Sequence, residues 1–344
     1  MAEENLTLDE LDHQLLHALQ LDARVPFARL AQLVNVSEQT IARRFRRLRA
    51  GGVVRVVGMV DPVPLGETAW IVRVQSRPNA AVSLADALAR RADVGWVTLT
   101  SGGSEILCVI MSRTTEQRDE LLLQRLPKTA QVLGMSAHSV MHRFETIDSW
   151  AYVGVRLSAE ACADLRAQAI GAGKKGTSSH PGSNGSSEPQ RLTAADELLL
   201  GELAADGRTA VSRLAEVAGW TPARVNRRLE ELVRAGLLYF DAEVALQAIG
   251  LRSRAFLWMT VPAARLQATG EALAQHNESM FVAATTGTTN LVSSVAFQNT
   301  AHLYRYVTES LGTLDAITGL EISPSLRMVK QGGTRMIGDR LATG

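Results

Sequence analysis

Residues 37 to 58 read SEQTIARRFRRLRAGGVVRVVG, and this stretch decides how the chain folds. Its apolar residues recur at Ile41, Phe45 and Leu48, a spacing that places the three side chains on one stripe of a helix. The five arginines between residues 43 and 49 then lie beside or opposite that stripe. The pattern therefore predicts an amphipathic helix with one apolar face and one strongly cationic face.

The cationic face is a local feature, because the chain as a whole is nearly neutral. Its 344 residues include 36 Lys and Arg against 35 Asp and Glu, a net charge of +1. This balance excludes a globally polycationic binder, so any nucleic-acid surface must be a local concentration of charge. The length exceeds one hydrophobic core, which predicts two or more domains.

The sequence also indicates where the protein works. Its two cysteines, Cys108 and Cys162, lie far apart in segments of different character, which favours a reducing compartment over a disulfide framework. The first ten residues, MAEENLTLDE, lack the basic and apolar regions of a secretory signal, and no apolar run approaches the ~18 residues of a membrane span. We therefore expect a cytoplasmic protein with no membrane partner.

The chain aligns with itself. Pairs 184 residues apart are Asp12 with Asp196, Arg24 with Arg208, Leu30-Ala31 with Leu214-Ala215, Ser37 with Thr221, Gly52 with Gly236, and Gly66 with Gly250. Farther on, Gly102 aligns with Gly287 and Gly134 with Gly319, now 185 apart, so one residue is inserted between. The sequence is therefore a tandem duplication. Its copies are joined at 171–190 by GAGKKGTSSHPGSNGSSEPQ, which is typical of a flexible linker.

The first part of each copy predicts three short helices followed by a β-rich run that would serve as a wing, at 53–60 in copy one. The expected helix starts in copy one are a capping box of Thr7 and Glu10 for a helix through Leu19, Pro26 for the second helix, and Ser37 for the third, which Gly51-Gly52 ends. In copy two, Thr209 is expected to cap the second helix and Thr221-Pro222 to open the third. A further helix capped by Ser158 precedes the linker.

The second part of each copy alternates strands and helices in the order βαββαβ, a ferredoxin-like sandwich. In copy one the strands are expected near 69–75, 95–100, 105–111 and 135–143, with helices near 83–91 and 115–126. In copy two the strands are expected near 253–261, 280–286, 290–297 and 319–329, with helices near 263–274 and 300–311. The predicted fold is α+β, with domains at 1–65, 66–150, 191–250 and 251–344 and a connecting segment at 151–190.

Residues 8–54, LDELDHQLLHALQLDARVPFARLAQLVNVSEQTIARRFRRLRAGGVV, resemble the winged helix-turn-helix of the Lrp/AsnC transcription regulators. The matching positions are Asp9, Asp12, Leu15, Leu16, Leu19, Asp22, Arg24, Leu30-Ala31, Ser37, Arg44, Leu48 and Gly52. The βαββαβ segment looks like that family's regulatory and dimerisation domain. The resemblance implies binding of double-stranded DNA, assembly into a homodimer or larger oligomer, and a small-molecule effector such as an amino acid.

The candidate DNA-binding residues lie on the third helix of each copy, since a helix fits the major groove. In copy one they are Ser37, Gln39, Thr40, Arg43, Arg44, Arg46 and Arg47. Gln39, Thr40 and Arg43 are expected at base edges, Arg47 at base or phosphate, and Arg44 and Arg46 at the backbone. In copy two they are Thr221, Arg224, Arg227 and Arg228. Glu230 and Glu231 replace two arginines there, which predicts weaker binding or a scaffold.

The candidate effector-binding residues lie in a glycine loop between the middle strands of each copy. They are Gly102, Gly103, Ser104 and Glu105 in copy one, and Gly287, Thr288, Thr289 and Asn290 in copy two. Many members of the resembled family have Asp after the loop glycine, whereas these loops have Glu105 and Asn290. Neither loop has the spacing of a phosphate-binding motif, so a tight turn is the plain alternative.

The sequence is also compatible with other functions. Siroheme decarboxylases also resemble this family as paired or fused units, but a cationic recognition helix has no use in a porphyrin pocket. A regulator that binds a protein through its β domains is a third possibility. His13 and His17 have a metal-ligand spacing without a third ligand, and His138 and His142 share a strand face. The sequence thus predicts no catalytic residues, no metal and no cofactor.

Overall fold

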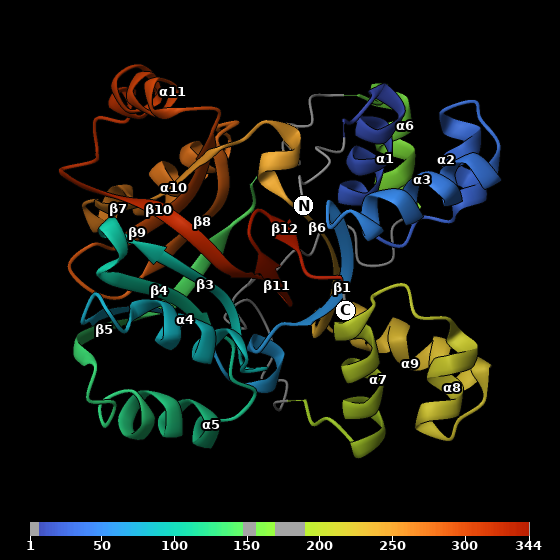
Figure 1. The fold of residues 1–344 in the computed structure, drawn as a ribbon, viewed down its shortest axis with the longest axis horizontal. Coiled ribbons are helices and arrows are strands. Elements are labelled where there is room, and N and C mark those ends of the chain that lie inside the picture. Colours follow the sequence, from blue (N-terminus) through green and yellow to red (C-terminus); the bar gives the residue numbers. More distant parts are fainter. Residues whose placement is uncertain (1–6, 147–155, 169–189, 344) are drawn as a thin grey trace.

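The computed structural model describes residues 7–146, 156–168 and 190–343. Two helix-turn-helix units lie on one side of the molecule, and a β barrel with its covering helices lies on the other (Figure 1). The predicted tandem α+β organisation is confirmed. The expected linker at 171–190 falls outside the described residues, apart from Gln190.

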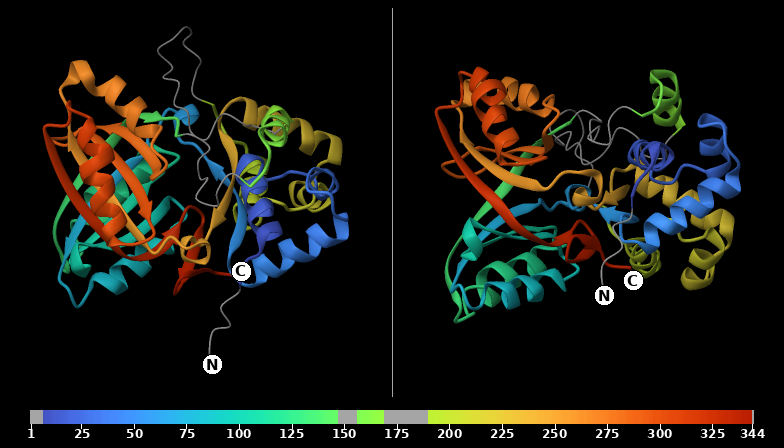
Figure 2. Two further views of the ribbon diagram at one scale, coloured as in Figure 1. Left: turned by 90° about the horizontal axis from the view of Figure 1, so that it is seen from above. Right: turned by 45° about the horizontal axis from the view of Figure 1, so that its top comes forward.

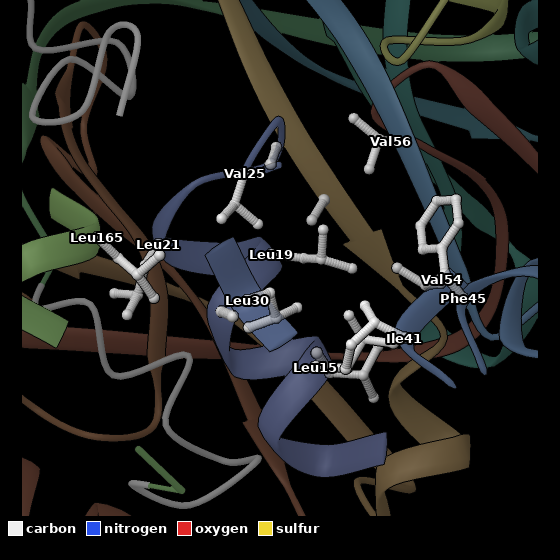
Figure 3. Packing of buried hydrophobic residues seen from close by; sticks show 14 of the residues in the cluster. Leu15, Leu19, Leu21, Val25, Leu30, Ile41, Phe45, Val54, Val56 and Leu165 are labelled. Carbon is white, nitrogen blue, oxygen red and sulfur yellow. The ribbon is translucent and has the colours of Figure 1, made fainter. Parts of the chain in front are cut away.

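The first helix-turn-helix unit consists of α1 (Glu10–Leu21), α2 (Phe27–Leu33) and α3 (Glu38–Ala50). As predicted, Ile41, Phe45 and Leu48 form the buried face of α3, with exposed fractions of 0%, 6% and 0%. Figure 3 shows Ile41 and Phe45 with leucines of α1 and α2 and valines of the following strand. This packing directs the polar face of α3 to solvent.

The predicted start of α1 is wrong. Its N-cap is Asp9, and the capping box joins Asp9 to Asp12 rather than Thr7 to Glu10. The Asp12 backbone N–H donates to Asp9 Oδ1 at 3.0 Å, and the Asp9 N–H donates to Asp12 Oδ2 at 3.1 Å. Aspartate serves at both positions of the capping box, because each carboxylate accepts a hydrogen bond from a backbone N–H that has no partner within the helix.

The second unit consists of α7 (Ala194–Ala205), α8 (Val211–Ala218) and α9 (Pro222–Arg234). Thr221 caps α9 as predicted, but Thr209 does not cap α8. The N-cap of α8 is Ala210, without a side-chain hydrogen bond, while the Thr209 hydroxyl donates to the Asp206 carbonyl at 2.7 Å. The hydroxyl therefore closes the preceding turn instead of the helix.

The β-rich runs after α3 and α9 do not form separate hairpin wings. They are β1 (Val54–Val60) and β6 (Leu238–Val244), which pair with each other antiparallel from Val54 opposite Val244 to Val60 opposite Leu238. This two-stranded ribbon lies between the two helix-turn-helix units (Figure 1). Phe240, Ala242 and Val244 of copy two pack in the core of the first unit. The two copies thus share one ribbon within a single chain.

Each regulatory half has the predicted βαββαβ order. Copy one contains a 3-10 turn (Val63–Leu65), β2 (Trp70–Ser76), α4 (Ala81–Ala89), β3 (Val94–Thr100), a turn at Ser101–Gly103, β4 (Glu105–Ile110), α5 (Thr115–Asp119) with a π-helical continuation (Glu120–Arg125), and β5 (Val132–Phe144). Copy two contains 3-10 turns (Leu246–Ile249 and Ala263–Arg265), β7 (Ser253–Thr260), α10 (Leu266–Ala274), β8 (Ser279–Thr285), β9 (Leu291–Phe297), α11 (Thr300–Arg305) with π-helical and 3-10 continuations (Tyr306–Ser310 and Leu311–Thr313), and β10 (Gly319–Gln331).

The last strand of each half crosses into the other half. β5 pairs with β2 up to Ser139 and with β8 from Val140, while β10 pairs with β7 up to Pro324 and with β3 from Ser325. The strand order β10-β3-β4-β2-β5-β8-β9-β7 returns to β10 and closes a ring. Helices cover its outside (Figure 2). The copies therefore pair within one chain, which the sequence alone left open.

Two further segments pack on the first helix-turn-helix unit. Helix α6 (Ala159–Gln168) is capped by Ser158, as predicted, with the Ala161 N–H donating to Ser158 Oγ at 3.1 Å. Its Cys162 and Leu165 join the core of α1 to α3. Both cysteines of the chain are buried, and they do not form a disulfide with each other. Among the described helices, none combines the length and the apolar composition of a membrane span.

The C-terminal hairpin is the second such segment, and no sequence pattern predicted it. It comprises β11 (Thr334–Ile337) and β12 (Arg340–Leu341). The Leu341 N–H donates to the Gly52 carbonyl at 2.9 Å, just after α3, and the Gly333 N–H donates to Glu243 Oε1 of β6 at 2.6 Å. The hairpin therefore connects the barrel to both the ribbon and α3.

Candidate nucleic-acid interface and ligand loops

The solvent-facing side of α3 carries the side chains that the sequence assigned to it. Gln39, Arg43, Arg46 and Arg47 are all exposed. Ser37 caps the helix, with its Oγ accepting from the Thr40 N–H at 3.1 Å. An exposed helix start with free amides and a positive dipole end favours phosphate oxygens. This face is therefore suited to a polyanion.

Arg44 is turned inward, away from the role of backbone contact that the sequence suggested. Its Nη1 lies 2.5 Å from Asp9 Oδ2 and 3.1 Å from Asp12 Oδ1, and Arg47 also pairs with Asp12. Asp12 is fully buried. The hydrogen bond from Arg44 is the main reason that the pKa of Asp9 lies below its ordinary value. Arg44 thus ties α3 to α1.

Copy two has the same internal tie at the equivalent positions. Arg228 donates from Nε to Asp196 Oδ1 at 2.8 Å and from Nη2 to Oδ2 at 3.0 Å. Asp196 is fully buried and takes part in the capping box with Thr193. Burial alone would raise the pKa of Asp196. The hydrogen bonds from Arg228 and Thr193 have a larger effect in the opposite direction, so the pKa lies below its ordinary value. Arg228 is therefore a structural cation.

The exposed face of α9 has ion pairs within the helix, which α3 lacks among the described residues. Arg227 lies 3.7 Å from Glu231, and Glu231 also accepts from Arg228 at 3.1 Å. The guanidinium of Arg224 stacks on Trp220, 4.2 Å from the ring centre. By contrast, Arg43 of α3 has no carboxylate partner among the described residues. The exposed faces of α3 and α9 therefore carry different electrostatic fields.

The two helix-turn-helix units are also joined to each other directly. Arg208, from the turn between α7 and α8, donates to the carbonyls of Ala23 and Val25, both at 2.9 Å. Its guanidinium stacks on Phe27 and Phe45 of the first unit, 4.4 and 5.6 Å from the ring centres. Burial in this contact lowers the pKa of Arg208 to about 10. These bonds restrict how α3 and α9 are oriented relative to each other.

The first glycine loop closes over a buried ion-pair network. Glu105 is 5% exposed and accepts from Arg73 Nε at 2.7 Å and from Thr100 Oγ1 at 2.9 Å. Arg73 also reaches Glu321 of β10 at 2.5 Å and lies over Trp258, 4.7 Å from the ring centre. Burial lowers the pKa of Arg73, but both carboxylates raise it more, so its charge is retained. Glu105 is therefore engaged internally, while Gly102 and Ser104 face solvent.

The second glycine loop rests on the strand that crosses from copy one. His138 Nδ1 lies 2.8 Å from the Thr286 carbonyl oxygen. At Gly287 the φ angle is +110°, and a Cβ atom would lie 2.5 Å from His138 Nδ1, so only glycine fits. Asn290 bonds through both side-chain atoms to the backbone of Val261. Thr288 is exposed and Thr289 half-buried. The carbonyl oxygens of Thr288 and Thr289 already accept from the hydroxyls of Thr260 and Thr285, at 3.1 and 3.2 Å.

Sequence reasoning missed the contacts that join the copies. Arg49 pairs with Asp206 of copy two at 2.8 Å, and Arg55 of β1 donates to the Ala342 carbonyl of the C-terminal hairpin at 2.8 Å. The internal alignment held a signal for both, since Val233 and Tyr239 stand at the equivalent positions of copy two. Within the described ranges, no group of three or more His, Cys, Asp or Glu residues is arranged to hold a metal ion.

Comparison with family models matches three parts of the chain. Residues 8–49 match the AsnC-type helix-turn-helix domain, residues 192–239 match a winged helix-turn-helix DNA-binding domain, and residues 254–334 match the Lrp/AsnC ligand binding domain. The two helix-turn-helix matches lie in different copies, as the duplication requires.

Comparisons with individual proteins agree with the family models. The HTH-type transcriptional regulator AldR of Mycolicibacterium smegmatis is 33% identical over 132 residues, which are 37% of this chain and 77% of AldR. An uncharacterized HTH-type transcriptional regulator of Pyrococcus furiosus is 25% identical over 150 residues, 43% of this chain and 99% of that protein. The crystal structure of the siroheme decarboxylase NirDL covers 94% of this chain and 93% of its own, with a TM-score of 0.61 and 14% identity. That last likeness shows a common tandem fold.

Proposed function

This chain belongs to the Lrp/AsnC family, and we propose that it regulates transcription by binding duplex DNA mainly through α3. The observation that carries the proposal is the exposed face of α3, where Gln39, Arg43 and Arg46 project with no carboxylate partner in the described part of the chain. Arginine donates to both phosphate oxygens and guanine edges, so one helix face serves for positioning and for readout.

We propose that the second recognition helix, α9, binds DNA with lower affinity than α3. Its ion pairs between Arg227 and Glu231 and between Arg234 and Glu230 must be broken or shared before phosphates are bound. Two acids facing the duplex add repulsion. Because the two helices differ in sequence, a single chain is expected to prefer an asymmetric DNA site.

A small-molecule effector is proposed for the two glycine loops. Both lie where the last strand of one copy crosses the other: Leu326 of β10 lies against Gly103, and His138 of β5 lies against Gly287. A ligand that binds one arrangement of these strands more tightly increases the population of that barrel conformation. The C-terminal hairpin contacts both the barrel and the end of α3, so it would transmit the change to α3. An amino acid is the effector class that we would test first.

Assembly of the chain with a second copy is also proposed. Strands of copy one already pair with strands of copy two within this chain, β1 with β6 and β5 with β8, so these edges are not available to a second chain. Apolar side chains nevertheless remain exposed on β5 and β10, with Leu133 at 64%, Met141 at 41% and Leu326 at 65%. Such side chains favour further association. Light scattering of the wild type and of Met141→Ser/Leu326→Ser would test this, with dissociation expected for the variant.

The decisive experiment is selection of bound sequences from a random or genomic DNA pool at one fixed salt concentration. Wild type is compared with Arg43→Ala and with its matched control in copy two, Arg227→Ala. We expect a defined motif for wild type, loss of that motif for Arg43→Ala, and retention of its core for Arg227→Ala. If the wild type enriches no sequence, the DNA-binding proposal fails.

A siroheme-decarboxylase-like enzyme is the second candidate, and the full-length likeness to the fold of NirDL favours considering it. That chemistry needs a porphyrin pocket with cations for the carboxylate side chains. Titration of the protein with an iron porphyrin, followed by absorbance, tests this candidate independently of DNA. A saturable spectral change together with no enriched DNA motif would favour the enzyme.

A further inference from the structure

A solvent-facing pocket of about 200 Å³ lies where α3, β1 and the C-terminal hairpin meet. Its lining includes Arg46, Arg49 and Arg55, and Leu341, Ala342 and Thr343 of the C-terminal segment. None of these residues is acidic. The volume exceeds what single waters require but is smaller than the roughly 300–1,000 Å³ of pockets for drug-sized ligands. The space therefore suits a small anion rather than a nucleotide or a peptide.

The three arginines of this pocket are held in place without being fully neutralised. Arg55 donates to two neutral acceptors, the carbonyl oxygens of Ala342 at 2.8 Å and Ala205 at 2.6 Å. Arg46 donates from Nε to the Ala42 carbonyl at 3.3 Å, which leaves its Nη atoms available. Of the three, only Arg49 has a carboxylate partner in the described part of the chain, Asp206. Like charges around one cavity repel each other, and an anion would relieve that repulsion.

The equivalent surface of copy two lacks this arrangement. Glu230, Val233 and Tyr239 stand at the positions of Arg46, Arg49 and Arg55. Tyr239 is buried, and Glu230 pairs with Arg234 at 3.9 Å. The cluster is therefore a specific feature of copy one and not a general property of a helix that meets the ribbon.

We propose that this pocket binds a phosphate-class anion. The guanidinium fork bonds phosphate oxygens in pairs, and the fixed orientation of Arg55 reduces the entropy lost on binding. The anion has two possible sources: a phosphodiester of a duplex lying along α3, or free phosphate, alone or on a small molecule. In either case it joins α3 to the C-terminal hairpin, whose backbone forms one wall. The second source goes beyond the proposed function, because it does not require DNA.

The first arm of the test uses the full-length chain without DNA. Sodium phosphate is titrated at constant ionic strength, with chloride as the balancing anion, and binding is followed by calorimetry and by the shift in Tm. For wild type we expect saturable binding, weakened about tenfold in Arg46→Gln, where one charged hydrogen-bonding group is lost. Arg234→Gln, at the equivalent surface of copy two, serves as the matched control and is expected to bind like wild type.

The second arm measures how the affinity for duplex DNA depends on salt. If a phosphodiester occupies the pocket, Arg46→Gln and Arg55→Gln each reduce the slope of log K against log salt by about one, and Arg234→Gln does not. Arg55 lies on β1, so its effect separates the pocket from the face of α3; circular dichroism checks that this variant folds. Equal phosphate response in all variants, together with an unchanged slope for Arg55→Gln, overturns the proposal. If the chain binds no DNA at all, the phosphate arm decides alone.

Discussion

Helices α3 and α9 are equivalent elements of one duplicated chain, and they differ on their surface while agreeing in their interior. Each is tied to the first helix of its unit by an arginine bonded to a buried aspartate, Arg44 with Asp12 and Arg228 with Asp196. Their exposed faces diverge: Arg46 and Arg47 of α3 are replaced by Glu230 and Glu231 in α9. The comparison shows that the arginines that stabilise the fold are mostly different from those available to a ligand, although they are neighbours in the sequence. Arg47 belongs to both groups, because it is exposed and also pairs with Asp12.

The shared anchor gives the largest expected effect. Asp12→Ala and Asp196→Ala each leave guanidinium groups beside an empty site, and we expect a loss of about 3–5 kcal/mol in the free energy of unfolding. The loss should be larger at Asp12, which pairs with both Arg44 and Arg47. Urea unfolding followed by circular dichroism measures it.

The control for this pair is Glu216→Ala, which removes an exposed partner of Arg213 and should leave the free energy of unfolding close to that of wild type. Losses at Asp12 and Asp196 no greater than that of the control would show that the buried carboxylates do not anchor the recognition helices.

Exchanging the surface charges of the two helices should change DNA affinity next most strongly. Arg46→Glu/Arg47→Glu gives α3 the acids of α9, and we expect binding to weaken by about 3 kcal/mol, roughly a hundredfold. Because Arg47 also pairs with the buried Asp12, circular dichroism checks that this variant folds. The reverse exchange, Glu230→Arg/Glu231→Arg, should strengthen binding by a smaller amount, because Arg228 remains bonded to Asp196. Fluorescence anisotropy at one salt concentration measures both. If only the reverse exchange changed the affinity for DNA, α9 and not α3 would be the main DNA-binding helix.

Periodicity and turn residues predicted most of the elements in both copies, because each depends on neighbours within a few positions. The stripe of Ile41, Phe45 and Leu48 is a local pattern, as are the caps at Ser37 and Thr221. The cap expected at Thr7 failed because Asp9, two residues on, serves the same purpose. Two neighbouring residues can each serve as an N-cap, and the sequence pattern alone does not show which of them begins the helix.

Strand partners and ion pairs were not predictable in the same way. β5 and β10 each have 13 residues, and that length accommodates two partners, yet alternation along a strand does not say which strands it will pair with. The inward turn of Arg44 depends on a buried carboxylate 32 positions away. The C-terminal hairpin docks through backbone atoms at Gly52, which leave no pattern in the side chains.

The two strands of the ribbon also differ, since Glu243 of β6 stands where β1 has Met59. Burial raises the pKa of Glu243 to about 8. The folded state therefore holds a proton that the unfolded state releases above about pH 4.5, so stability falls as pH rises from about 5 to 8 and then levels off. Glu243→Gln should remove this decline and exceed wild type by on the order of 2 kcal/mol at pH 8.5. Urea unfolding at several pH values measures it, and parallel pH profiles of both proteins would contradict it.

The glycines that follow α3 and α9 provide the most finely matched comparison. Gly52 and Gly236 both have positive φ, +63° and +72°, so alanine strains the backbone equally at each, by about 1 kcal/mol. Their surroundings differ: a Cβ at Gly52 would lie 2.6 Å from the Leu341 carbonyl oxygen, whereas nothing lies within 4 Å at Gly236. Gly52→Ala should therefore cost about 1–2 kcal/mol more, by displacing the C-terminal hairpin.

Limited proteolysis distinguishes displacement of the hairpin from general weakening of the fold. We expect cleavage within the C-terminal hairpin to accelerate in Gly52→Ala and to stay at the wild-type rate in Gly236→Ala, because only the first substitution meets the hairpin backbone. Equal cleavage in both variants would mean that the hairpin is held by its other contacts, such as the bond from the Gly333 N–H to Glu243. In that case the coupling between barrel and α3 runs through the ribbon instead.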